Sequence, residues 1–242
     1  MAADYSTLRD SSLADLKKYM DSLDPEQGKK LAYWIKDYTH FLSQEKSFQP
    51  QKLIRYKRGA IVKVHLGYRV GSEEGGLHYA IVMDRNNTIY NPTVTIIPLT
   101  SVKPSTDITN LHESKVHIGD EVYTLLANKL TAEIKSANGN LAAIRTALSG
   151  LDDDAPEREA LRKQLTEVAK QIAYCGKMNK EVEKMKPGSI AMVGQITTVS
   201  KLRIYDPKYK NDIFTKLRVS SATLDTLDER VQQLFGTPKS SN

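Results

Sequence analysis

The sequence predicts an α+β fold in which a small β-barrel carries helices at both ends and is interrupted by a helical hairpin. Three observations lead to this prediction. Apolar residues recur at helical spacing near the N-terminus, short β-branched runs with glycine and proline turns follow, and a heptad-spaced stretch divides those runs into two groups. We therefore divide the chain into a helical extension (1–50), a barrel with a C-terminal helix (51–125 and 187–242), and an inserted hairpin (126–186).

The extension is expected to form two helices within residues 11–46. Asp24, Pro25 and Gln27 predict the start of the second helix, because they supply a capping side chain, a first-turn proline and a capping-box glutamine. The apolar face of that helix consists of Leu31, Trp34, Ile35, Tyr38, Phe41 and Leu42. Such a stripe is typical of core packing or of contact with a partner.

The barrel strands are predicted from short apolar runs. Before the insertion these runs are 60–66, 77–83, 93–100, 115–118 and 121–124, and after it they are 189–193, 195–199, 202–205 and 216–219. Pro98 should place its strand at an edge or a bulge, since proline cannot donate to a sheet ladder. A terminal amphipathic helix is expected from Ser221 to Leu234.

The inserted segment predicts an antiparallel helical hairpin. Its first seam comprises Leu130, Ile134, Ala137, Leu141, Ile144 and Leu148, and its second Leu161, Leu165, Val168, Ile172, Cys175 and Val182. The turn at 149–156 carries an acidic cluster and Pro156, which suit the start of a helix. We interpret the hairpin as an arm rather than as the chemical centre.

Composition restricts the class of protein. Of the 242 residues, 40% are hydrophobic and 26% are charged, which is typical of a globular chain. The sequence holds neither a membrane-spanning apolar run nor the apolar stretch of a secretory signal, and a single cysteine, Cys175, cannot form an intramolecular disulfide. We expect a cytoplasmic protein. The net charge of +6 fits a polyanionic partner such as RNA, although many proteins that bind no nucleic acid have similar charge.

A glycine-rich loop is the strongest chemical signal. Residues 67–76 hold four glycines, whose amides could approach an anion, and His78 follows directly. Ser72 and Thr100 could add hydroxyl donors, while His78 could exchange a proton near neutral pH. The sequence contains no metal-binding, phosphate-loop or dinucleotide motif. On the residues alone, an ordinary hairpin loop followed by a half-buried strand histidine is the favoured interpretation.

Two ordered blocks change that interpretation. The segments KRGAIVKVHLGYRVGSEEGGLHYAIVMDRNN and TVTIIPLTS resemble the start of the MazF/PemK (Kid) toxin family, and PGSIAMVGQITTVSKLRI resembles a later family segment. The resemblance implies an SH3-like barrel of the MazF/CcdB type over 55–125 and 187–220. It also implies a homodimer and a cognate antitoxin that lays a tail across the RNA groove.

The family activity implied is sequence-specific cleavage of single-stranded RNA, including mRNA, without a metal ion or another cofactor. The products are a 2′,3′-cyclic phosphate and a 5′-hydroxyl. Matched by position, His78 replaces the catalytic arginine of the family, Thr100 its catalytic threonine and Ser72 its loop serine. Arginine is always charged, whereas histidine can alternate between base and acid.

Further residues are expected to contact RNA. They are Arg69, Gly75 and Gly76 in the loop and Gln195, Thr198, Lys201 and Arg203 in the later block. Tyr68 and Tyr79 are candidate stacking residues, with core or rim packing as the alternative. A second acid or base is required, and His65, His112, His117 and Arg203 remain open.

Two other functions compete with the nuclease. One is a non-catalytic RNA- or protein-binding module on the same barrel. The other is a gyrase poison like CcdB, which acts through a C-terminal Trp-Gly-Ile; here the chain ends Gly-Thr-Pro-Lys-Ser-Ser-Asn and the only tryptophan is Trp34, so this alternative is disfavoured. The N-terminal helices and the hairpin could bind the antitoxin, cover the groove or extend the dimer, and their residues do not choose among these roles.

Overall fold

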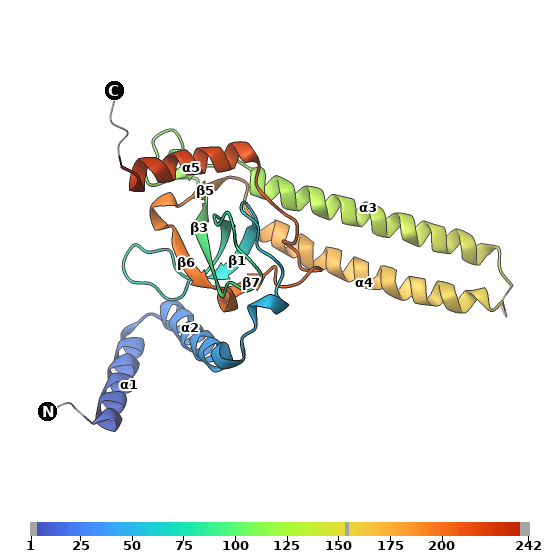
Figure 1. Cartoon of the computed structure of the whole chain (residues 1–242). Coiled ribbons are helices and arrows are strands. Elements are labelled where there is room, and N and C mark those ends of the chain that lie inside the picture. Colours follow the sequence, from blue (N-terminus) through green and yellow to red (C-terminus); the bar gives the residue numbers. More distant parts are fainter. Residues whose placement is uncertain (1–3, 153–154, 238–242) are drawn as a thin grey trace.

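The computed structural model describes residues 4–152 and 155–237 and confirms the α+β class (Figure 1). The helices are α1 (Tyr5–Ser22), α2 (Pro25–Gln44), α3 (Glu121–Ser149), α4 (Glu157–Lys184) and α5 (Ser221–Phe235). The strands are β1 (Ile61–His65), β2 (Leu77–Val82), β3 (Thr93–Ser101), β4 (Val116–His117), β5 (Ser189–Ala191), β6 (Thr197–Ser200) and β7 (Ile204–Asp206). Figure 1 shows the sheet between α2 on one side and α5 on the other, with α3 and α4 projecting as a long arm. Residues 153–154 of the predicted acidic turn and residues 238–242 at the predicted chain end lie outside the described residues.

The strands form one antiparallel sheet in the order β4-β5-β3-β2-β1-β7, and β6 also pairs with β3. β4 lies at one end of this order and β7 at the other. Among the described strands no pairing joins β4 to β7, so the pairings do not show a closed barrel. Apolar side chains pack on both faces of the sheet. Val62, Val82 and Ile96 belong to one buried cluster, while Ile81 and Ile97 belong to the other.

Pro98 lies in an inner strand, at the place where β3 changes its neighbour. On one edge β3 pairs with β2, which brings Pro98 opposite Ala80. On its other edge β3 pairs with β6 up to Ile96 and with β5 from Leu99 onward. The proline carbonyl still accepts a bond from the Met192 amide at 2.9 Å. The expectation of an edge strand or bulge is thus corrected: the missing N–H falls at the junction between two neighbouring strands.

The predicted strand at 121–124 is wrong, because these residues form the first turn of α3. The Thr124 amide donates to the Asp120 carbonyl at 2.8 Å, and Val122 is buried in the core. Val122 stands four residues before Leu126, so it continues the helical seam toward the sheet. The predicted strand at 216–219 reduces to a single bridge between Ala60 and Arg218.

The antiparallel arm is confirmed, but only part of its predicted seam is buried. Ala137 and Ile144 of α3 and Val168 and Cys175 of α4 are buried. The alternate seam residues Ile134, Leu141, Leu165 and Ile172 are 37–50% exposed. The helices therefore pack through about one apolar layer per heptad instead of the two of a full coiled coil.

The base of the arm is joined to the sheet by a partly buried ion pair. The Lys63 ammonium lies 2.5 Å from the Glu181 carboxylate, which also accepts a bond from the Tyr79 hydroxyl at 3.0 Å. Burial opposes ionisation of Glu181, but these two partners outweigh it and hold the pKa of the carboxyl below its usual value. No helix within the described ranges combines the length and the apolar composition needed to cross a bilayer.

Candidate functional site

The loop at residues 67–76 is closed by its own backbone. The Gly76 amide donates to the Gly67 carbonyl at 2.7 Å, and the Leu66 amide donates to the Gly76 carbonyl at 2.7 Å. A Cβ atom at Gly75 would lie 2.8 Å from the same Gly67 carbonyl oxygen, and Gly76 has a φ of 84°. Both positions therefore require glycine, one for space and the other for its left-handed backbone.

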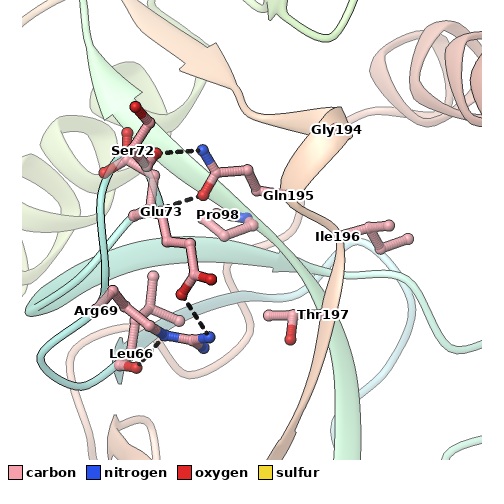
Figure 2. A pocket seen from close by; sticks show the side chains of 10 residues that line it. Leu66, Arg69, Ser72, Glu73, Pro98, Gly194, Gln195, Ile196 and Thr197 are labelled. Carbon is pink, nitrogen blue, oxygen red and sulfur yellow. Dashed lines mark hydrogen bonds and ion pairs between the residues drawn. The ribbon is translucent and has the colours of Figure 1, made fainter.

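Gln195 fixes the opposite side of the loop. Its side-chain oxygen accepts a bond from the Glu74 amide at 2.6 Å, and its side-chain amide donates to the Ser72 carbonyl at 3.1 Å (Figure 2). Gln195 ends the short helix η3 (Val193–Gln195), which lies far from the loop in sequence. Both polar ends of Gln195 are thus engaged, so its role in the structure is to hold the loop in place.

His78 is held between the loop and β3. Its Nδ1 lies 3.1 Å from the Leu99 carbonyl oxygen, which can only accept, so Nδ1 carries a proton. Its Nε2 lies 3.5 Å from a Glu74 carboxylate oxygen, and both side chains are 23% exposed. Sequence reasoning did not identify Glu74, although its position four residues before a candidate catalytic histidine was available as a signal.

His78 lies on β2 and Thr100 lies on the neighbouring strand β3. The pairing of these two strands runs from Ala80 opposite Pro98 to Val82 opposite Ile96, so His78 and Thr100 each lie two residues beyond its end near the loop. Thr100 is half-buried and pairs with Ile190 of β5 on its other side.

Two hollows flank the loop. The first, of about 420 Å³, is lined by Ser72 and Gln195, and the second, of about 740 Å³, is lined by His78 and residues of α2. Arg69 and Glu73 line both hollows, and their charged groups lie 3.4 Å apart. Ser72 and His78 therefore face different sides of the loop. Within residues 4–152 and 155–237, no three His, Cys, Asp or Glu side chains are grouped as metal ligands would be.

The placement of Lys201 corrects its expected role as an RNA contact. The side chain is fully buried, its ammonium donates to the Thr88 carbonyl at 2.9 Å, and it lies 5.5 Å from the centre of the Tyr56 ring. Burial lowers the pKa of this ammonium. The charged group is therefore engaged inside the protein and is not available to bind a ligand.

Arg203 and Thr198 differ in their surroundings. The Arg203 guanidinium donates to the His65 carbonyl at 2.8 Å and lies 5.5 Å from the centre of the Trp34 ring. It therefore joins α2 to β1. Thr198 is exposed on β6, and its side chain is accessible at the surface. Its hydroxyl bonds to that of Thr95 at 3.1 Å.

Among the histidines left open by the sequence, His65 lines the same hollow as His78. Its ring stacks on Trp34 with centroids 4.8 Å apart, its Nδ1 accepts the Gly67 amide at 3.0 Å, and its Nε2 lies 3.7 Å from Asp37. Burial lowers the pKa of His65, Asp37 opposes this shift, and Arg203 adds to it. Both nitrogens are thus occupied by protein groups.

The other open residues lie elsewhere in the fold. The His112 ring bonds to the Ser114 hydroxyl at 2.8 Å, and His117 is exposed on β4. Tyr79 packs against Phe214 and donates to Glu181, so its predicted stacking role is replaced by the alternative of core packing. Burial raises the pKa of Tyr79. Tyr68, by contrast, is exposed beside the second hollow.

Comparison with known families identifies the part of the chain that contains this loop. Residues 57–138 match the family model of PemK-like, MazF-like toxins of type II toxin-antitoxin systems. The resemblance seen in the sequence is confirmed for these residues. The PemK/MazF-like segment carries Ser72, Glu74, His78 and Thr100, whereas Gln195 and the contacts from α2 lie outside it. No curated protein matches the chain.

Proposed function

We propose that this chain is a toxin endoribonuclease that cuts single-stranded RNA at specific sequences, with His78, Thr100 and Ser72 at its active site. The observation that carries the proposal is the placement of His78. A PemK/MazF-like segment brings an imidazole to the end of the glycine loop, where it bonds to the carbonyl of Leu99, the residue before Thr100. Family toxins of this kind are generally RNA endonucleases.

In the proposed reaction the ribose 2′-oxygen attacks the phosphorus atom and the bond to the 5′-oxygen breaks. The products are a 2′,3′-cyclic phosphate and a 5′-hydroxyl, and the family precedent implies that no metal ion takes part. One group must accept the 2′-hydroxyl proton while another donates to the leaving oxygen. Since Leu99 holds Nδ1, the Nε2 atom of His78 is the one that exchanges a proton.

Glu74 is the best-placed second titratable group. Its carboxylate faces Nε2 of His78, and its backbone is fixed by Gln195. We assign Glu74 and His78 as the acid–base pair, in preference to His65, whose nitrogens are both engaged. Thr100 and the loop amides would stabilise the charge that develops on the phosphorane oxygens, and Ser72 would contact the RNA strand from the neighbouring hollow.

The biological setting follows from the family. We propose a homodimer that acts in the cytoplasm and is neutralised by a cognate antitoxin. The RNA surface would include Arg69, Gly75, Gly76 and Thr198, with Gln195 and Arg203 holding that surface in shape. Lys201 is left out because its ammonium is buried.

The test is cleavage of end-labelled single-stranded RNA by purified protein in EDTA. The wild type should cut at a restricted set of sites and leave 5′-hydroxyl ends, which a polynucleotide kinase labels directly. His78→Ala and Thr100→Ala should each lower the rate by about two to four orders of magnitude. His117→Ala, at an exposed position of β4, is the matched control and should cut normally.

Two results would contradict the proposal. Normal cleavage by both site variants, with circular dichroism showing intact folding, would remove His78 and Thr100 from the site. Tight RNA binding by the wild type without any cleavage would favour the non-catalytic RNA-binding module.

A further inference from the structure

The hollow beside His78 has a wall that does not come from the PemK/MazF-like segment. The hollow has a volume of about 740 Å³ and lies between the glycine loop and α2. Lys30, Tyr33 and Trp34 of α2 line one side, and Tyr68 and Arg69 of the loop line the other. A hollow of several hundred Å³ has room for a small ligand or one unit of a polymer.

The wall from α2 is firmly attached to the sheet. Trp34 stacks on His65, and its neighbour on the same helix, Asp37, accepts a bond from the Tyr205 hydroxyl at 2.9 Å. The Arg203 guanidinium also lies against the Trp34 ring. Residues on this face of α2 are therefore held at a fixed place beside the loop.

The residues presented there have the chemistry of a site for unpaired nucleic acid. The Tyr33 side chain is 58% exposed and that of Tyr68 is 37% exposed, although both line a concave surface. Lys30 and Arg69 add positive charge, and the Arg69 guanidinium lies 3.4 Å from the Glu73 carboxylate. Exposed aromatic rings next to cations bind single strands by stacking on the bases and attracting the phosphates.

We propose that α2 supplies a base-binding subsite of the nuclease. An unpaired base next to the cleaved phosphate stacks on Tyr33, and Lys30 contacts a neighbouring phosphate. The subsite makes the N-terminal extension part of substrate selection and assigns one of its helices a role in choosing the cleavage sequence. This inference rests on the proposed RNA substrate, but it concerns binding and can be tested apart from cleavage.

The experiment measures binding of single-stranded RNA that carries 2′-O-methyl groups, which lacks the attacking hydroxyl and cannot be cut. Fluorescence anisotropy with the full chain gives the dissociation constant. Tyr33→Ala should weaken binding about ten- to a hundredfold, while Tyr33→Trp should restore it. Lys30→Ala should weaken binding severalfold and reduce the salt dependence.

Matched controls lie on the same two N-terminal helices. Tyr5→Ala removes an exposed tyrosine of α1, and Lys36→Ala removes an exposed lysine of α2; neither residue lines the hollow, and neither change should alter binding. In the cutting reaction, sequencing of the RNA ends should show a relaxed preference next to the cut for Tyr33→Ala.

The outcomes separate this inference from the proposed function. Binding that depends on Tyr33 without cleavage by the wild type would support the subsite and overturn the nuclease. Cleavage by the wild type together with unchanged affinity and unchanged cut sites in Tyr33→Ala would overturn the subsite alone. An antitoxin peptide that binds wild type but not Tyr33→Ala, while RNA binding is unchanged, would also overturn it and assign the hollow to a protein partner.

Discussion

The Nδ1 atom of His78 lies 3.1 Å from the carbonyl oxygen of Leu99, the residue that precedes Thr100. The imidazole is therefore positioned by the backbone of β3, whereas the glycine loop only approaches it from one side. The relative positions of the two proposed catalytic side chains depend on the pairing of β2 with β3.

Restoring the family arginine tests whether a titrating group is needed at position 78. His78→Arg places a permanent cation there, which cannot give up its proton at neutral pH. We expect cleavage to fall by about two orders of magnitude or more, because one acid–base partner is lost. Cleavage at the wild-type rate would mean that charge alone is required.

Gln195 is predicted to act through the loop. Gln195→Glu keeps the size of the side chain but cannot donate to the Ser72 carbonyl, and it places a carboxylate next to that oxygen. Cleavage should fall about ten- to a hundredfold because the loop is displaced. Stability in urea should change by only about 1 kcal/mol. Thr198→Ala, an exposed substitution three residues later, is the control for stability, and equal cleavage rates for the wild type and Gln195→Glu would rule out the positioning role.

Two glycine substitutions should change the free energy of unfolding in opposite directions. Gly75→Ala puts a Cβ atom 2.8 Å from the Gly67 carbonyl, so we expect the free energy of unfolding to fall by about 1–3 kcal/mol. Gly139→Ala lies inside α3, where a Cβ meets nothing within 4 Å, and it should raise that free energy by up to about 1 kcal/mol. Urea denaturation measures both changes. A neutral Gly75→Ala would show that the loop can shift without cost.

The contact between His65 and Trp34 should make the tryptophan signal depend on pH. Burial lowers the pKa of His65 below 6.5, so the folded state resists protonation more than the unfolded state does. Stability should therefore decline as pH falls below about 6.5, because the unfolded chain takes up the proton first. Trp34 is the only tryptophan, and its fluorescence should change with a midpoint below 6.5 as His65 becomes charged.

A substitution of the histidine checks the origin of that transition. His65→Asn should remove the fluorescence transition, while His117→Asn, which changes an exposed histidine, should leave it in place. Persistence of the transition in His65→Asn would assign it to another group.

The sequence predicted those features that depend on local pattern. The cap at Asp24 is confirmed by its bond to the Gln27 amide at 3.0 Å, and the runs around 61–65, 77–82 and 93–101 form strands. The segment at 121–124 misled the prediction because β-branched and aromatic residues favour strands, whereas its position next to the helical seam decided the outcome.

Long-range contacts could not be predicted in this way. The bond from His78 to Leu99 depends on how β2 and β3 lie next to each other. The two hydrogen bonds from the Gln195 side chain to the loop span 121 and 123 positions of the sequence. Lys201 was expected at the surface because charged residues are seldom fully buried. Its ammonium instead donates to the Thr88 carbonyl next to the Tyr56 ring, and a single sequence gives no sign of this.

The contacts of Trp34 set a limit on how the domain could be divided or transplanted. The Trp34 ring touches His65, lies against Arg203, and would be only 3.0 Å from a Cβ atom at Gly67, where the loop begins. A shortened protein that starts after α2 would leave that ring's place open to water beside the loop. Grafting the loop onto a smaller relative would therefore require α2 to be moved with it.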